Sequence, residues 1–167
     1  MLARWWRFPK FRRVGRALVT HGVVGQEQVA IVKPQTFMNR SGEALGPLAA
    51  ESGFDVSRDM LVLVDEFALP LGTFRLRARG SAGGHNGLQS VEDRLETQEY
   101  SRLRIGIGPL PSDAIDPADF VLASFEQPES ETLTAIMPTL VEAVDCWVRE
   151  GIEVAMNRYN RREQPSD

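Results

Sequence analysis

A glycine-rich loop carries residues well suited to hold a ligand. The sequence GSAGGHNG covers residues 80–87 and places His85 and Asn86 near its end. Glycines permit positive φ and a close backbone approach, so this loop offers backbone amides, a ring nitrogen and a side-chain amide to a bound molecule. Its spacing differs from that of a nucleotide-binding glycine loop. The alternative is a flexible turn between a strand and a helix.

A second candidate site is the segment PQTFMNRSG, residues 34–42. It places Phe37, Met38 and Asn39 directly before an expected helix, for which Ser41 is a plausible N-cap. An exposed aromatic ring, a thioether and an amide suit gripping a peptide or a nucleobase. The alternative is a helix-entry staple in which Phe37 is buried.

Asp65 is the candidate acid partner of a catalytic histidine. Residues 60–64 form a continuous apolar run, which predicts a strand buried on both faces and ending at Asp65 and Glu66. Ligand crevices form where strands of open α/β sheets end, and a carboxylate there can orient a histidine. A solvated strand-end carboxylate is the alternative. The chain has two histidines, His21 and His85, so a mechanism that needs a histidine base depends on them.

Arginines on two of the predicted strands form a candidate phosphate site. Arg75, Arg77 and Arg79 alternate with apolar residues, and Arg102 and Arg104 do the same on a later strand. The forked guanidinium donors match phosphate oxygens. The alternative is that these charges protect an edge strand from aggregation.

The elements that must position these residues alternate between strands and helices. Residues 18–24 and 29–32 predict a hairpin, because both are rich in β-branched side chains. Further strands are predicted at residues 60–64, 73–78 and 103–107. Apolar residues at helical spacing predict helices at 42–52, 88–96, 129–150 and 152–159. Residues 109–119 are predicted to be a loop, and Pro138 to kink the long helix. This pattern indicates a single α/β domain.

Composition narrows the function classes. The chain has 167 residues, a net charge of −4 and one cysteine, Cys146, which excludes a disulfide framework and a cysteine-rich zinc site. No apolar run reaches the roughly 18 residues that a membrane-spanning helix needs. Residues 1–40 contain eight basic residues and one acid, Glu27. A basic head on an acidic body indicates an anionic partner near one end.

Together these segments resemble bacterial-type peptidyl-tRNA hydrolase. Four blocks match in order, namely VKPQTFMNRSG, LVDEFALPLG, GSAGGHNGLQSV and SRLRIGIG, and GIEVAMNRYN matches the family's closing helix. The resemblance covers residues 14–160. It leaves residues 1–13 as a basic, non-matching head and residues 161–167 as a disordered tail.

The resemblance implies a single α/β domain with a twisted, mixed central sheet flanked by helices. It implies hydrolysis of the ester that joins a peptide to the 3′ ribose of tRNA, by a cytoplasmic monomer that uses no metal and no other cofactor. Asp65 would orient the general-base histidine. Phe37, Met38 and Asn39 would lie in the peptide and ester site, with His85 lining the same cleft. Asn86 would contact the tRNA 3′ end, and Arg75, Arg77 and Arg104 its phosphate.

The sequence departs from the family pattern where the general base should be. The family opens with a strand, a GNPG-type loop and a helix bearing an RHN-type motif, and neither motif occurs in these residues. His21 and His85 do not match the base's position, and Val64 and Ala68 replace a His and an Asp common beside the aspartate. The first strand is therefore expected to be missing.

Three hypotheses follow from this departure. In the first, the protein is a peptidyl-tRNA hydrolase whose true start lies further upstream. In the second, it is a catalytically silent relative that binds tRNA. In the third, His85 or His21 replaces the missing base.

Overall fold

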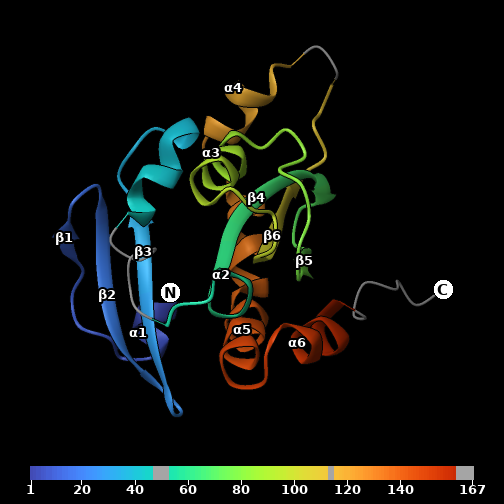
Figure 1. The fold of residues 1–167 in the computed structure, drawn as a ribbon. Helices are drawn as coiled ribbons and strands as arrows, with labels where there is room; N and C mark the ends of the chain where they lie inside the picture. Colours follow the sequence, from blue (N-terminus) through green and yellow to red (C-terminus); the bar gives the residue numbers. More distant parts are fainter. Residues whose placement is uncertain (47–52, 113–114, 161–167) are drawn as a thin grey trace. The chain divides into compact units, whose positions relative to one another are not determined.

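The computed structural model describes residues 1–46, 53–112 and 115–160. The chain divides into two compact units, one formed by residues 1–61 and 78–101 and the other by residues 62–77 and 102 onward. Each unit combines helices with a three-stranded sheet (Figure 1). The predicted α/β class is confirmed, and its strands are divided between these two sheets.

The sheet of the first unit is an antiparallel meander in the order β1-β2-β3. Its strands are β1 (Arg12–Val14), β2 (Ala17–Val24) and β3 (Glu27–Pro34). A two-residue turn joins β2 to β3, and Gly25 adopts there the positive φ (+65°) that such turns require. The predicted hairpin is confirmed. Neither β1 nor the preceding one-turn helix α1 (Leu2–Trp5) was expected from the sequence.

The helices of the first unit are η1 (Met38–Leu45), α2 (Val56–Asp59) and α3 (Asn86–Leu95). η1 is a 3₁₀ helix that begins earlier than predicted, and Ser41 is not its N-cap. The Ser41 hydroxyl instead donates a hydrogen bond to the carbonyl oxygen of Met38, at 2.8 Å. The rest of the helix predicted here, residues 47–52, lies outside the described residues.

The sheet of the second unit has the order β4-β6-β5. Its strands are β4 (Leu61–Pro70), β5 (Phe74–Arg77) and β6 (Ser101–Gly108), and β5 runs antiparallel to β6. β6 lies close to the end of β4, because a Cβ on Gly106 would come within 2.0 Å of the Pro70 carbonyl oxygen. Phe74, Leu76 and Leu103 form the buried face of this sheet.

The predicted end of β4 is wrong, because the strand continues past Asp65 to Pro70. The prediction of a strand buried on both faces is also wrong, since Leu63 is 42% exposed. The two acids do not stop the strand because β4 presents half-buried and exposed positions that tolerate charge. Glu66 also forms an ion pair with Arg104 of β6, the strand beside β4.

Three helices complete the second unit: α4 (Pro117–Leu122), α5 (Gln127–Glu150) and α6 (Ile152–Tyr159). α5 continues through Pro138, and Gly151 ends it as predicted, with φ of +85°. The prediction of a loop over residues 109–119 is wrong at its end, because α4 begins at Pro117. The Asp116 carboxylate caps the Ala118 amide, and Pro117 occupies the first helical position, where proline is favoured. The predicted tail, residues 161–167, lies outside the described residues.

Membrane-spanning helices are absent from the described ranges, in which no helix is both long and apolar enough to cross a bilayer.

Candidate active site

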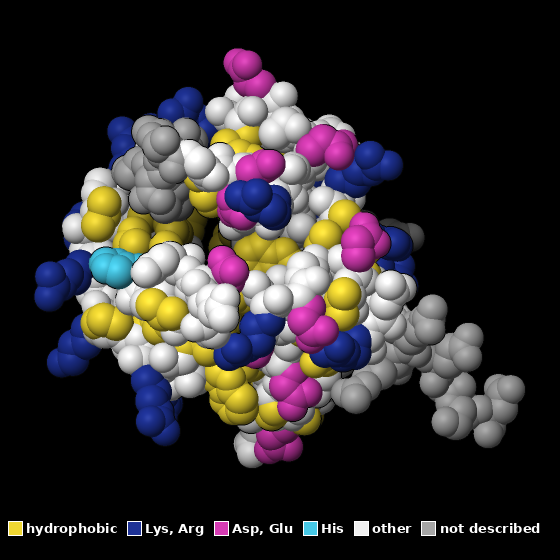
Figure 2. Space-filling view, turned by 60° about the horizontal axis from the view of Figure 1, so that its bottom comes forward, with side chains coloured by type: hydrophobic (Ala, Val, Ile, Leu, Met, Phe, Trp, Pro, Cys, Tyr) yellow, Lys and Arg dark blue, Asp and Glu magenta, His cyan; other side chains and the backbone are white. Residues whose placement is uncertain are grey.

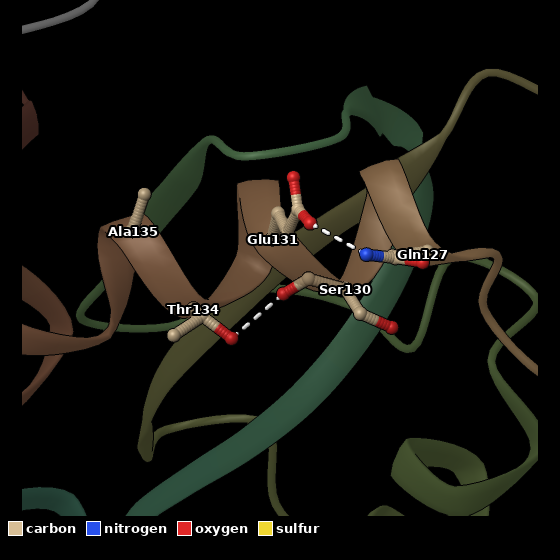
Figure 3. A pocket seen from close by; sticks show the side chains of 5 residues that line it. All are labelled: Gln127, Ser130, Glu131, Thr134 and Ala135. Carbon is tan, nitrogen blue, oxygen red and sulfur yellow. Dashed lines mark hydrogen bonds between the residues drawn. The ribbon is translucent and has the colours of Figure 1, made fainter.

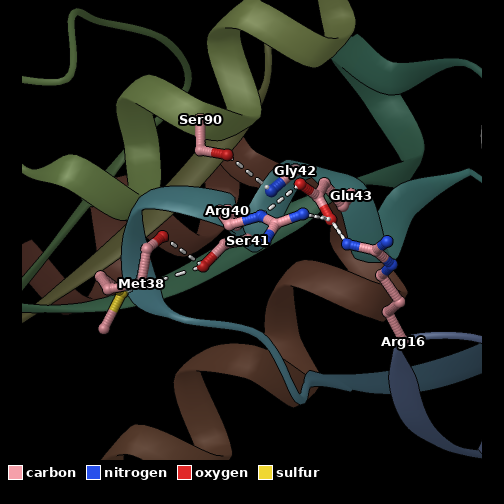
Figure 4. A network of polar contacts seen from close by, with 7 residues as sticks. All are labelled: Arg16, Met38, Arg40, Ser41, Gly42, Glu43 and Ser90. Carbon is pink, nitrogen blue, oxygen red and sulfur yellow. Dashed lines mark hydrogen bonds and ion pairs between the residues drawn. The ribbon is translucent and has the colours of Figure 1, made fainter.

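The helices η1 and α3 are packed against each other in the first unit. The Gly42 amide of η1 donates a hydrogen bond to the Ser90 hydroxyl of α3, at 3.0 Å (Figure 4). A Cβ on Gly42 would lie 2.1 Å from the Ser90 carbonyl oxygen, so only glycine fits at this contact. The two helices are therefore held together by this hydrogen bond and by the close approach of their backbones.

The beginning of η1 presents the predicted trio of side chains to solvent. Phe37 is 80% exposed and Met38 53% exposed, and Asn39 is also exposed. The alternative of a buried Phe37 is therefore wrong. A hydrophobic ring this open in a folded chain is available to a ligand.

Met38 connects this trio to the glycine-rich loop. Its Sδ atom lies 2.7 Å from the position that a Cβ on Gly87 would occupy, and Gly87 is in the first turn of α3. The neighbouring residue, Asn86, is exposed. The structure thus brings Met38, on the first motif, together with the end of the second motif.

His85 caps helix α3. Its Nδ1 atom accepts hydrogen bonds from the amides of Gly87 (3.1 Å) and Leu88 (3.2 Å). A neutral imidazole has one acceptor nitrogen, and here that nitrogen is used by the helix. Taking a proton from water at Nδ1 would break both hydrogen bonds. His85 is therefore unsuited to be the general base.

His21 lies within the hairpin. It is an exposed residue of β2 and is paired with Ala30 of β3. Among the described residues, the His21 side chain forms no hydrogen bond and no ion pair.

Asp65 belongs to the second unit, where it lies half-buried in the middle of β4. Its neighbour Glu66 forms an ion pair with Arg104 of β6, and both side chains are largely buried. A Glu66 carboxylate oxygen also accepts a hydrogen bond from the Ala68 amide, at 3.0 Å. The carboxyl group of Glu66 is therefore held by two neighbouring groups.

The arginines of β5 and β6 face each other in pairs. The register sets Arg75 opposite Arg104 and Arg77 opposite Arg102. Arg77 is exposed, Arg75 half-buried and Arg102 fully buried. Like charges directly opposite one another are unfavourable, and the Glu66 carboxylate offsets part of this charge at Arg104.

Arg79 does not share the face predicted for it. β5 ends at Arg77, and Arg79 pairs with Glu99 at 3.5 Å.

A shallow hollow on α5 contains none of the predicted site residues. It is lined by one face of the helix, and Gln127 and Thr134 form hydrogen bonds along that face (Figure 3). We assign it no chemistry.

Comparison with known families decides the class of this protein. A family model described as peptidyl-tRNA hydrolase matches residues 1–167, and this range includes the basic head. The chain belongs to the peptidyl-tRNA hydrolase family. The hydrolase class expected from the sequence motifs is therefore confirmed.

Relatives named peptidyl-tRNA hydrolase cover most of the chain. The protein from Gemmatimonas aurantiaca is 44% identical over 158 residues, which are 93% of this chain and 83% of the relative. The protein from Symbiobacterium thermophilum is 48% identical over 134 residues, 80% of this chain and 70% of the relative.

Solved structures of peptidyl-tRNA hydrolases share the fold. A complex with n-propanol has a TM-score of 0.87 and 25% identity, covering 99% of this chain and 83% of that chain. The Acinetobacter baumannii enzyme has a TM-score of 0.85 and 26% identity, covering 95% of this chain and 80% of that one. The predicted fold of a mixed sheet flanked by helices is confirmed.

Sequence reasoning missed two contacts, one in each unit. Ser90 holds η1 against α3, and Glu66 pairs with Arg104. Gly42 was a usable signal for the first contact, because a glycine inside an expected helix indicates close packing. The pairing of Glu66 with Arg104 depends on strand order, which sequence spacing does not reveal.

Proposed function

We propose that the protein hydrolyses the ester between the peptide and the 3′ ribose of tRNA in peptidyl-tRNA. The observation that carries this proposal is the joined start of η1 and α3. It exposes Phe37, Met38 and Asn39 on one helix and Asn86 on the other. Together they offer apolar contact for a peptide and two amides for polar groups beside the ester.

The two asparagines are suited to the reacting atoms. Within the described residues, the side chains of Asn39 and Asn86 make no hydrogen bond, so their amides remain available to a ligand. An amide N–H can stabilise the oxyanion that forms when water attacks the ester carbonyl, and an amide oxygen can hold the water. We assign Asn86 to the tRNA 3′ end and Asn39 to the ester.

Asp65 orients the general-base histidine in this proposal. A carboxylate fixes the tautomer of an imidazole and stabilises the imidazolium that forms when it takes a proton from water. His85 lines the site and keeps Asn86 in place through its cap on α3. Arg75 and Arg77 bind a tRNA phosphate, and Arg104 adds to this charge while paired with Glu66.

The general base is, in our proposal, neither His85 nor His21. The Nδ1 atom of His85 is engaged by two backbone amides, and His21 lies on the hairpin. The base and the strand that precedes it would then be encoded upstream of Met1. We further propose that the enzyme works as a metal-free monomer in the cytoplasm, where its tRNA substrate is.

Hydrolysis of an N-acetylated aminoacyl-tRNA tests this function. We expect cleavage by the chain extended to an upstream start, and little or none by the 167-residue chain, although both bind deacylated tRNA. Binding without cleavage by the extended chain would instead support a catalytically silent tRNA-binding protein. An in-frame stop codon directly before Met1 would contradict an upstream base.

A further inference from the structure

Residues 4–13, the basic segment, carry an unusual concentration of uncompensated charge. Five exposed cations lie within it: Arg4, Arg7, Lys10, Arg12 and Arg13. None of the five forms an ion pair in the described part of the chain, and the first acid of the sequence is Glu27. Several arginines outside this segment form ion pairs with acids, whereas the positive charge of the segment is not neutralised by such pairs.

The basic segment is anchored to the hairpin and is not a loose end. The Phe8 ring packs on Gly22 of β2, where a Cβ would come within 2.6 Å of it. The Pro9 carbonyl accepts a hydrogen bond from the Thr20 hydroxyl, at 2.8 Å. β1 then pairs with β2 over three residues. The cations are therefore held on a fixed scaffold, which lowers the entropy lost when they bind a ligand.

The cations flank one edge of the sheet. β1 is an edge strand, and the consecutive residues Arg12 and Arg13 point to opposite faces. In Figure 2, Lys and Arg side chains project on the side of the view where β1 and β2 lie in Figure 1, with no acidic side chain between them. An edge of this kind offers donors to successive groups of an extended anion.

The basic segment is close to the candidate active site within the first unit. Arg16, in the turn after β1, pairs with Glu43 of η1, and Arg40 pairs with the same carboxylate (Figure 4). Strands rise about 3.3 Å per residue, so Arg12 lies within roughly 15 Å of Arg16. An extended anionic polymer bound at the start of η1 can therefore also reach the basic segment.

We propose that the basic segment is a second RNA-binding surface, which contacts phosphates of the tRNA away from the ester. This inference rests on the proposed function, because it takes tRNA as the ligand. A lipid surface fits less well. Phe8 packs on Gly22, and the Phe11 ring lies under the Lys33 ammonium. Trp5 is exposed, but it lies on α1, which is a single turn, whereas interfacial helices present a long apolar face.

The test measures binding of deacylated tRNA by fluorescence anisotropy over a range of salt concentrations. The variant is Arg12→Gln/Arg13→Gln. Its matched control is Arg58→Gln/Arg149→Gln, which removes the same charge from arginines that are paired with acids. Thermal unfolding verifies that both variants fold. This binding measurement does not depend on catalysis. A failure of the proposed hydrolysis would appear only in the cleavage assay and can be told apart from a failure of this proposal.

We expect Arg12→Gln/Arg13→Gln to raise Kd by roughly fivefold or more and to lower the salt slope by about 1 for each arginine. The control should stay near wild type. Unchanged tRNA binding by the variant would overturn the proposal, as would equal weakening in the control. Loss of binding to vesicles containing anionic lipid, with tRNA affinity intact, would assign the surface to a membrane and also overturn it.

Discussion

His85 has a structural role that its residue type alone does not reveal. A histidine beside an asparagine in a glycine-rich loop predicts a ligand-facing ring, and the resemblance placed it in the cleft. The structure adds that Nδ1 accepts two amides at the start of α3. Phe37, Met38 and Asn39 could be predicted as an exposed group because their chemistry is visible in the sequence. The cap and the Glu66–Arg104 pair could not, since both depend on geometry between residues.

Replacement of His85 tests the cap. His85→Ala removes the acceptor for the Gly87 and Leu88 amides, and we expect a loss of about 1 kcal/mol in the free energy of unfolding. His85→Asn should lose less, because asparagine is a good N-cap. Urea unfolding of both variants measures the difference. Equal stability of the alanine and asparagine variants would show that the cap contributes nothing.

The elements differ in how far local sequence determines them. The hairpin, α3, α5 and α6 were predictable because their periodicity and glycine boundaries are local. The length of β4 was not predictable. Two consecutive acids such as Asp65 and Glu66 can end a strand or lie within it, depending on which side chains the neighbouring strand places beside them. α4 was missed although Asp116 and Pro117 are a usual helix start. The order of the strands in each sheet was also not predictable, because it too depends on contacts between residues far apart in the sequence.

Asn160 closes the outer edge of β5. Its side-chain amide donates to the Leu76 carbonyl and accepts from the Leu76 amide, both at 2.9 Å. Asn160→Ala would leave both backbone groups without these partners, so we expect a loss of about 1–3 kcal/mol in the free energy of unfolding. Chemical denaturation measures it. A stability within 0.5 kcal/mol of wild type, roughly the range of ordinary surface changes, would contradict this role.

Gly42 tests the packing of η1 on α3. Gly42→Ala forces a Cβ toward the Ser90 carbonyl oxygen, so the two helices must separate. We expect lower thermal stability and weaker tRNA binding, because the exposed trio moves away from Asn86. Gly46→Ala is the control, since nothing lies within 4 Å of its Cβ. Equal behaviour of the two variants would show that this contact does not position the site.

At the scale of the whole molecule, charge is divided between the head and the remainder. The basic segment keeps its charge, whereas Arg149 of α5 and Arg158 of α6 are paired with acids. Arg158 of α6 forms two hydrogen bonds to Glu150 of α5, at 2.7 and 3.0 Å, next to the Cys146 thiol. These bonds join the last two helices. The sequence showed the charge asymmetry but not which charges are neutralised.

The Glu150–Arg158 pair makes stability depend on pH. Hydrogen bonds from Arg158 lower the pKa of Glu150 below its ordinary value of 4.5. A carboxyl whose pKa is lowered by folding stabilises the folded state above that ordinary value, and this contribution is lost as pH falls through the lower, folded-state pKa. Thermal unfolding between pH 3 and 7 should therefore show a smaller acid-induced loss for Glu150→Gln than for wild type. Parallel pH profiles would contradict this linkage.

Ester hydrolysis with an Asp65-oriented base is the central claim. The most direct measurement is kcat for peptidyl-tRNA cleavage by the upstream-extended chain and by its Asp65→Asn and His85→Asn variants. The account predicts a fall of roughly 100-fold or more for Asp65→Asn, with tRNA affinity unchanged, and a much smaller fall for His85→Asn. Full activity of Asp65→Asn, or abolition of cleavage by His85→Asn in a stably folded chain, would contradict it.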